Sequence, residues 1–159
     1  MSPSLRPALL AALAALVLAH ARPASACTCL EPPSVEASRA AAVAVFTGVP
    51  RAIASAAPEH PGAVWVTFDV AAVWKGAVTP QYAVLTPESG ATCGIDFDLD
   101  VEWLVYAFPS GNEADSPPFT HLCSRTAHAA GNPDFAVLGP PVSTLSAMAS
   151  WGRLKTLYR

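Results

Sequence analysis

The chain has 159 residues, 52% of them hydrophobic and only 13% charged, with a formal net charge of −3 at pH 7. Its basic residues form no cluster that could neutralise a run of phosphates, so we expect neither a nucleic acid nor an anionic membrane surface as a partner. With 16 prolines and no long charged run, the composition is that of a small folded domain with many turns.

The first 26 residues have the pattern of a secretory signal peptide. Arg6 lies in a short basic start, residues 8–19 are apolar, and Ala24-Ser25-Ala26 is a small-x-small cleavage site. The apolar run is too short for a membrane span, and no second run follows. We therefore predict a secreted, periplasmic or extracellular protein in which cleavage after Ala26 makes Cys27 the first residue.

A second interpretation of the same segment is that it belongs to a bacterial lipoprotein. A cysteine directly behind small residues is also where lipoproteins are cut and acylated, although Ala24 stands where that route prefers a larger aliphatic residue. Acylation would anchor the protein through Cys27, block its α-amine and occupy its thiol. The two interpretations therefore make opposite predictions about the chemistry of Cys27.

Residues 27–159 are enough for one domain, and they contain all four cysteines. Export places these cysteines in an oxidising compartment, which favours two disulfides. A bond between Cys27 and Cys29 would close a strained ring, so each is expected to bond with Cys93 or Cys123. The spacing fits neither the CxxC of redox enzymes nor a structural zinc site, and His60, His121 and His128 are scattered.

The first part of this domain is predicted to contain a helix and three strands. Ser34 caps a helix from Val35 to Ala41, and the Val- and Phe-rich stretch from Val43 to Val49 favours a strand. A loop from Arg51 to Gly62 follows. Alternating apolar residues make Val64 to Trp74 the strongest strand signal, with Gln81 to Thr86 as its antiparallel partner.

The second part begins with a loop, Pro87 to Gly94, that carries Cys93. Trp103 to Phe108 is apolar on both faces and predicts a buried strand, and Phe119 to Cys123 is predicted as a last extended piece after a polar loop. Asn132-Pro133-Asp134 can begin a helix that ends at Leu138. Five short strands and little helix favour a closed antiparallel barrel of the five-stranded OB type, with short flanking helices, over residues 27–140.

The C-terminal tail, residues 141–159, contains apolar residues near helical spacing from Thr144 onward. We predict a helix packed on the barrel, with a partner-binding helix as the alternative. The sequence contains no GxSxG, HExxH or phosphate loop, so we do not expect an enzyme, and no cofactor is predicted. The segment Asp96 to Asp100 is not a calcium loop, because Val101 and Ala107 replace the required Gly and Glu.

Several short motifs together resemble the netrin-like domain, and specifically bacterial relatives of the tissue inhibitors of metalloproteinases. They are the Cys-Thr-Cys start, Val45-Phe46-Thr47-Gly48, the Val-Trp-Lys-Gly end of Val70 to Gly76, Thr92-Cys93-Gly94, Leu104-Val105-Tyr106-Ala107 and Leu122-Cys123-Ser124-Arg125-Thr126. The resemblance covers residues 27 to about 138. It implies an OB-fold with the disulfides Cys27–Cys93 and Cys29–Cys123.

The resemblance also implies a function. In these inhibitors the α-amine and carbonyl of the first cysteine chelate the catalytic zinc of a metalloprotease, which here would make Cys27 the chelator. Thr28 would enter the specificity pocket, and Ala91 and Thr92 would contact the protease beside it. Other netrin-like domains are interaction modules without inhibitory activity, in which the CxC is purely structural, and this alternative stays open. Arg125 is expected either to serve the function or to pair with an acidic neighbour.

Overall fold

The fold is that of a computed structural model, in which residues 27–29, 31–111 and 116–145 are described. The predicted signal peptide, residues 1–26, lies outside the described residues, and so does the tail from residue 146 to residue 159. Within the described ranges, no helix has the length and apolar character needed to cross a membrane.

The described chain is mainly β, with two short α-helices and one 3-10 turn. The helices are α2 (Val35–Ala41) and α3 (Phe135–Leu138), and the turn η1 spans Gly90–Thr92. Four strands are long: β1 (Ala44–Ser55), β2 (Ala63–Lys75), β3 (Gln81–Pro87) and β4 (Trp103–Pro109). Three strands have two residues each: β5 (Pro118–Phe119), β6 (Ala127–His128) and β7 (Ser143–Thr144).

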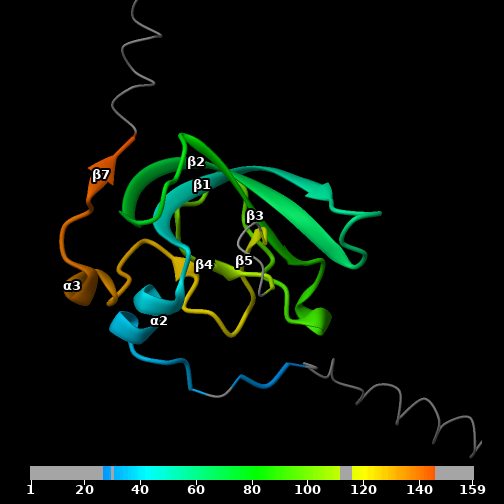
Figure 1. Ribbon diagram of the computed structural model, residues 1–159, viewed down its shortest axis with the longest axis horizontal. Coiled ribbons are helices and arrows are strands. Elements are labelled where there is room, and N and C mark those ends of the chain that lie inside the picture. Colours follow the sequence, from blue (N-terminus) through cyan, green and yellow to red (C-terminus); the bar gives the residue numbers. More distant parts are fainter. Residues whose placement is uncertain (1–26, 30, 112–115, 146–159) are drawn as a thin grey trace, which may run out of the picture.

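Five of these strands pair in a closed circuit, which we call the sheet ring. Strand β1 is antiparallel to both β2 and β4, and β2 is antiparallel to β3. The two-residue strand β5 completes the circuit, because it pairs with β3 on one side and with β4 on the other. The β3–β5 pairing is parallel, so the prediction of a wholly antiparallel sheet was wrong at this position. Figure 1 shows α2 and α3 together at one end and the β1–β2 hairpin extending from the other.

Helix α2 forms where the sequence predicted it and is attached to the end of β2. Ser34 Oγ accepts a hydrogen bond from the backbone N–H of Ala37 at 3.2 Å. At the other end, Lys75 Nζ donates to the carbonyl oxygens of Arg39 and Ala40 at 2.8 and 2.7 Å. These bonds satisfy backbone groups that a short helix leaves unpaired. The segment from Cys27 to Pro33 is therefore followed by a helix that is attached to the end of β2.

Strand β1 is longer than predicted, because it continues through Pro50 to Ser55. The register with β2 shifts between Pro50 and Ala52, and a bulge of this kind is a position where a proline without an N–H is tolerated. The prediction of a loop throughout Arg51 to Gly62 was therefore wrong for its first half. Strand β2 is long enough to pair with β1 as far as Ser55, whose partner is Val64.

Two other predictions are corrected at the C-terminal side. Only Pro118 and Phe119 pair as a strand, whereas the predicted extended piece from Phe119 to Cys123 turns, with Ser124 N–H donating to the His121 carbonyl at 2.9 Å. Ser143–Thr144 forms strand β7 on β2, so the tail begins as a strand where a helix from Thr144 was predicted. The rest of that predicted helix falls outside the described residues.

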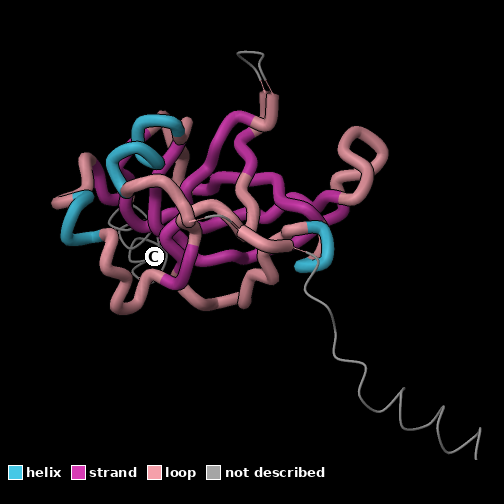
Figure 2. The backbone as a smooth tube through the Cα atoms, turned by 90° about the horizontal axis from the view of Figure 1, so that it is seen from below, coloured by secondary structure: helices cyan, strands magenta, loops and turns pink. Residues whose placement is uncertain are grey.

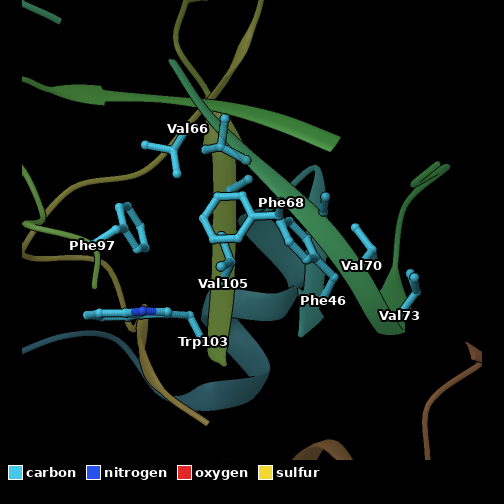
Figure 3. Close-up of a cluster of buried hydrophobic side chains, with 11 residues drawn as sticks. Phe46, Val66, Phe68, Val70, Val73, Phe97, Trp103 and Val105 are labelled. Carbon is cyan, nitrogen blue, oxygen red and sulfur yellow. The ribbon is translucent and has the colours of Figure 1, made fainter. Parts of the chain in front are cut away.

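The apolar core consists of two clusters on opposite sides of β4. Trp103, Val105 and Ala107 belong to the first cluster, and Leu104 and Tyr106 belong to the second. The sequence predicted this alternation, because the run from Trp103 to Phe108 is apolar on both faces. In the first cluster, Phe46 and Phe68 meet edge to face with ring centroids 5.5 Å apart. Figure 3 shows Phe97 and Trp103 at one end of this cluster and Val70 and Val73 at the other. The second cluster lies under α2 and α3 and includes Trp74.

Candidate functional site

Two disulfides fasten the first described residues to two different loops. Cys27 is bonded to Cys93 and Cys29 to Cys123, with Cα–Cα distances of 5.5 and 5.2 Å. This is the pairing that the family resemblance implies, and no cysteine in the described chain is free. We call residues 27–29 together with residues 90–93 the ridge. Figure 2 shows the start of the described chain beside η1, at the opposite end of the molecule from α2.

The loop that carries Cys93 is shaped by short backbone hydrogen bonds around Ser89. The Ser89 carbonyl accepts from the N–H groups of Thr92 and Gly94 at 3.0 and 2.8 Å, and from Thr92 Oγ1 at 3.0 Å. Cys93 has a positive φ of 68°, in the left-handed region. A Cβ on Gly94 would lie 2.0 Å from the Pro87 carbonyl oxygen. The shape of the loop therefore requires glycine at position 94, and the Thr92 hydroxyl helps to hold the turn.

The two cysteine-bearing loops are also bonded to each other. The Cys93 carbonyl accepts a hydrogen bond from the N–H of Leu122 at 2.8 Å. Cys123 N–H donates to His121 Nδ1 at 3.1 Å, and burial lowers the pKa of His121 below its usual value. The acceptor nitrogen is thus kept unprotonated at neutral pH, which preserves this bond. His121 supports the loop behind the second disulfide.

A buried polar network lies behind the ridge. Tyr106 N–H donates to Thr126 Oγ1 at 2.9 Å, and Thr126 Oγ1 also lies 2.8 Å from Thr120 Oγ1. Tyr106 Oη donates to Asp134 Oδ2 at 3.0 Å, and burial, reinforced by that carboxylate, raises the pKa of Tyr106 far above its usual value. Buried polar groups satisfied in this way make one arrangement more favourable than its alternatives. The network therefore fixes the segment 120–126 against β4.

Arg125 connects this network to Pro33, in the segment between Cys29 and α2. Its guanidinium binds the Asp134 carboxylate at 2.5 and 2.8 Å and donates from Nη1 to the Pro33 carbonyl at 3.1 Å. Hydrogen bonding from Arg125 lowers the pKa of Asp134, against the opposing effect of burial. The prediction that Arg125 pairs with an acidic neighbour is confirmed. The segment from Cys27 to Pro33 is thereby held at three places.

The predicted contact residues of the ridge lie together and face outward. Cys27 Sγ is 3.9 Å from the Ala91 carbonyl oxygen, which is a packing contact because a disulfide sulfur has no proton to donate. Thr28, Ala91 and Thr92 are exposed, and Cys27 is half-buried. The cleavage site that would free the α-amine of Cys27 lies outside the described residues. What the described geometry offers is a short segment that is exposed at Thr28 and held by a disulfide on either side.

No group of three or more metal-ligating side chains occurs among the described residues. Two of the three carboxylates of the segment 96–100 have separate partners: Asp98 lies 3.3 Å from His128 Nε2, and Asp100 pairs with Arg51. Arg51 also binds Asp69 at 2.9 Å, and that hydrogen bond is the largest influence raising the pKa of Arg51. These three charges connect the hairpin to the segment before β4.

One feature that the sequence did not predict is a groove next to the ridge. It has a volume of about 950 Å³, and Gly90 and Ala91 of the ridge form part of its wall. Trp103 and His128 also line it, with their ring centroids 4.2 Å apart. The residues that line the groove are far apart in the chain and meet only in the folded protein, so no local sequence pattern indicated it.

Comparison with protein-family models found no match, and comparison with curated proteins found none either. The netrin-like resemblance therefore remains a prediction from the motifs, and the function has to be argued from the geometry of the ridge.

Proposed function

We propose that this protein is a secreted inhibitor of zinc metalloendopeptidases, similar to the tissue inhibitors of metalloproteinases. In this proposal the α-amine and carbonyl of Cys27 chelate the zinc of the target protease. The observation that carries the proposal is the ridge. Cys27 and Cys29 are bonded to two separate loops, while Thr28 between them stays exposed. Residues that only staple a fold together need no such exposed strip.

The chemistry of the target supports this arrangement. A catalytic zinc has three protein ligands and one exchangeable position that holds water. The amine nitrogen and carbonyl oxygen of one residue can bind a metal as a five-membered chelate, which would displace that water. Rigid presentation reduces the conformational entropy lost on binding. In the proposal, Thr28 enters the pocket beside the zinc, and Ala91 and Thr92 contact the protease next to it.

The proposal includes an OB-type barrel for residues 27–140, preceded by a cleaved signal peptide. The closed circuit of β1, β2, β3, β5 and β4 supports a five-stranded barrel. Two disulfides support an extracellular or periplasmic location, where such bonds persist. The motifs from Cys27 to about Leu138 support the netrin-like family.

The decisive experiment adds one alanine before Cys27. The variant keeps both disulfides but moves the free amine to the added alanine, so Cys27 can no longer form the five-membered chelate. Mature protein, this variant and a control with one alanine after Arg159 are assayed against a panel of zinc metalloendopeptidases. We expect the parent and the control to inhibit a member of the panel and the variant to lose at least a hundredfold in inhibition constant, with unchanged thermal unfolding.

Two outcomes would overturn the proposal. Equal inhibition by the extended variant excludes chelation, and no inhibition by the parent across the panel favours the interaction-module function with a purely structural CxC. Intact mass of the mature protein comes first, since a diacylglycerol adduct on Cys27 would rule out a free amine. Inhibition should also strengthen as pH rises from 6 to 8, because a terminal amine with a pKa of about 7.7–8.0 must lose its proton to bind zinc.

A further inference from the structure

The groove beside the ridge has the size and composition of a binding site. Its volume of about 950 Å³ is at the upper end of the range of about 300–1,000 Å³ typical of ligand sites. It is lined by residues from two segments, 90–96 and 126–133, and by Trp103 and Leu122. Most of the lining residues are apolar, including Ile95, Leu122 and Ala130. An occupant with a large apolar side chain would be removed from water here.

The charges around the groove select a basic occupant. Among the lining residues, only Asp96 and His128 are ionisable, and His128 is already paired with Asp98 at 3.3 Å. Asp96 has no ion-pair partner among the described residues and is exposed. Glu102 lines the adjoining hollow, which shares Ala130 with the groove. A carboxylate-bearing rim of this kind attracts a lysine or arginine side chain and repels an acidic one.

The backbone along the groove favours an extended polypeptide. Strand β6, which contributes Ala127 and His128 to the wall, pairs only with β4 in the described sheet and ends the order of strands. An added strand on this edge would replace the hydrogen bond that the His128 carbonyl accepts from Asn132 Nδ2 at 3.2 Å. The indole N–H of Trp103 is buried without an acceptor among the described residues. His128, whose side chain is 52% exposed, packs against this indole and can rotate away to admit a carbonyl of the occupant.

We propose that the groove binds an extended polypeptide segment, with a large apolar side chain over Trp103 and a flanking basic side chain paired with Asp96. The segment would run beside β6. Cys27 does not line the groove. The proposed site therefore stands or falls independently of zinc chelation by the ridge.

The proposal can be tested with three blocked synthetic hexapeptides. The first has two central leucines flanked by lysines, the second replaces the lysines with glutamates, and the third replaces the leucines with serines. Each is titrated into the oxidised, mature protein, and because the peptides carry no zinc, chelation by Cys27 cannot contribute. The reporter is the Trp103 indole N–H resonance, assigned with the Trp103→Phe variant.

We expect a saturable shift of this resonance with the lysine–leucine peptide and at least tenfold weaker binding of the other two. Ala130→Phe fills the groove from an exposed position and should weaken binding at least tenfold, whereas Ala83→Phe, an exposed site on β3, should leave it unchanged. Asp96→Asn should weaken binding at least threefold and reduce its salt dependence. Absence of a saturable shift at millimolar peptide, equal binding of the glutamate peptide, or unchanged binding by both Ala130→Phe and Asp96→Asn would overturn the proposal.

Discussion

The interior of the sheet ring and the ridge are held together by different forces. Inside the ring, Phe46 and Phe68 are fully buried and make only apolar contacts with aromatic and aliphatic neighbours. In the ridge, Thr28 and Thr92 are exposed, and two disulfides fix the chain in place of burial. The comparison separates stability from function: changes in the interior should unfold the protein, and changes at the tip of the ridge should alter binding alone.

The polar network between these two regions combines burial, as in the ring, with bonds that hold the chain behind the ridge. Tyr106 belongs to the second apolar cluster, yet its hydroxyl donates to Asp134, which also binds Arg125. Arg125 in turn holds the Pro33 carbonyl behind the ridge. Substitutions in this network should therefore affect both stability and the position of the ridge.

The largest effect is expected from Phe46→Ala, which leaves a cavity inside the ring. The loss should be about 3–5 kcal/mol in the free energy of unfolding, as for other buried aromatic truncations. Urea unfolding followed by circular dichroism measures it. Ile53→Ala is the matched control, because that side chain is 47% exposed on β1. Equal losses in the two variants would mean that the ring has no distinct interior.

The next effect is expected from removing the second disulfide with the double variant Cys29→Ser, Cys123→Ser. The unfolded chain gains freedom, and the loss should be about 2–5 kcal/mol. Inhibition should weaken as well, because Thr28 would be held from one side only. Unfolding and inhibition assays on the same preparation measure both. Unchanged inhibition would show that the second disulfide does not position the ridge.

A smaller effect is expected from Asp134→Asn, which removes the charge bound by Arg125. Hydrogen bonds to charged groups contribute about 1.5–3 kcal/mol, and we expect a loss in this range at pH 7. Because Arg125 lowers the pKa of Asp134 in the folded state, its contribution is fully present above the unfolded pKa of about 3.9 and is lost as the pH falls through the lower folded value.

The difference between parent and Asp134→Asn should therefore narrow in acid. Urea unfolding at pH 7 and at pH 3 measures this. Tyr106→Phe is the control, since it keeps the Arg125–Asp134 pair and removes one hydrogen bond. A gap that stays constant over this pH range would contradict the assignment of the charge to Asp134.

The smallest effect on stability is expected at Thr28. This side chain is exposed, so Thr28→Arg should change the free energy of unfolding by no more than about 0.5 kcal/mol. The same substitution should change inhibition at least tenfold, because residue 28 enters the specificity pocket in the proposed function. Thr144→Arg, at another exposed position, should change neither quantity. Inhibition that is insensitive to residue 28 would contradict the proposed contact.

Local patterns in the sequence predicted the elements whose formation depends on their own residues. Alternating apolar residues located β2, and its partner β3 followed from the turn between them. Ser34 marked the start of α2. The run from Trp103 to Phe108, apolar on both faces, predicted β4, whose residues divide between the two apolar clusters. These features follow from side-chain periodicity and capping, which a single sequence contains.

Features that depend on distant partners could not be predicted in the same way. Strand β1 extends past Pro50 because β2 is long enough to pair with it and a bulge accommodates the proline. Strand β5 is short and parallel to β3, and nothing in the sequence of Pro118 and Phe119 indicates this. The groove exists because residues near 90, 103 and 128 meet in space.

The sequence by itself determined a mainly β domain with two disulfides, and it predicts a cleavage that would make Cys27 the N-terminus. Periodicity, composition and cysteine spacing are local properties, so they can be read without coordinates. Only the tertiary structure decided how the disulfides place Thr28 at the surface of the ridge and how the Arg125–Asp134 pair supports the chain behind it. It also decided that the groove lies beside the ridge. These depend on contacts between residues far apart in the chain, and such contacts exist only when the ring of strands has closed.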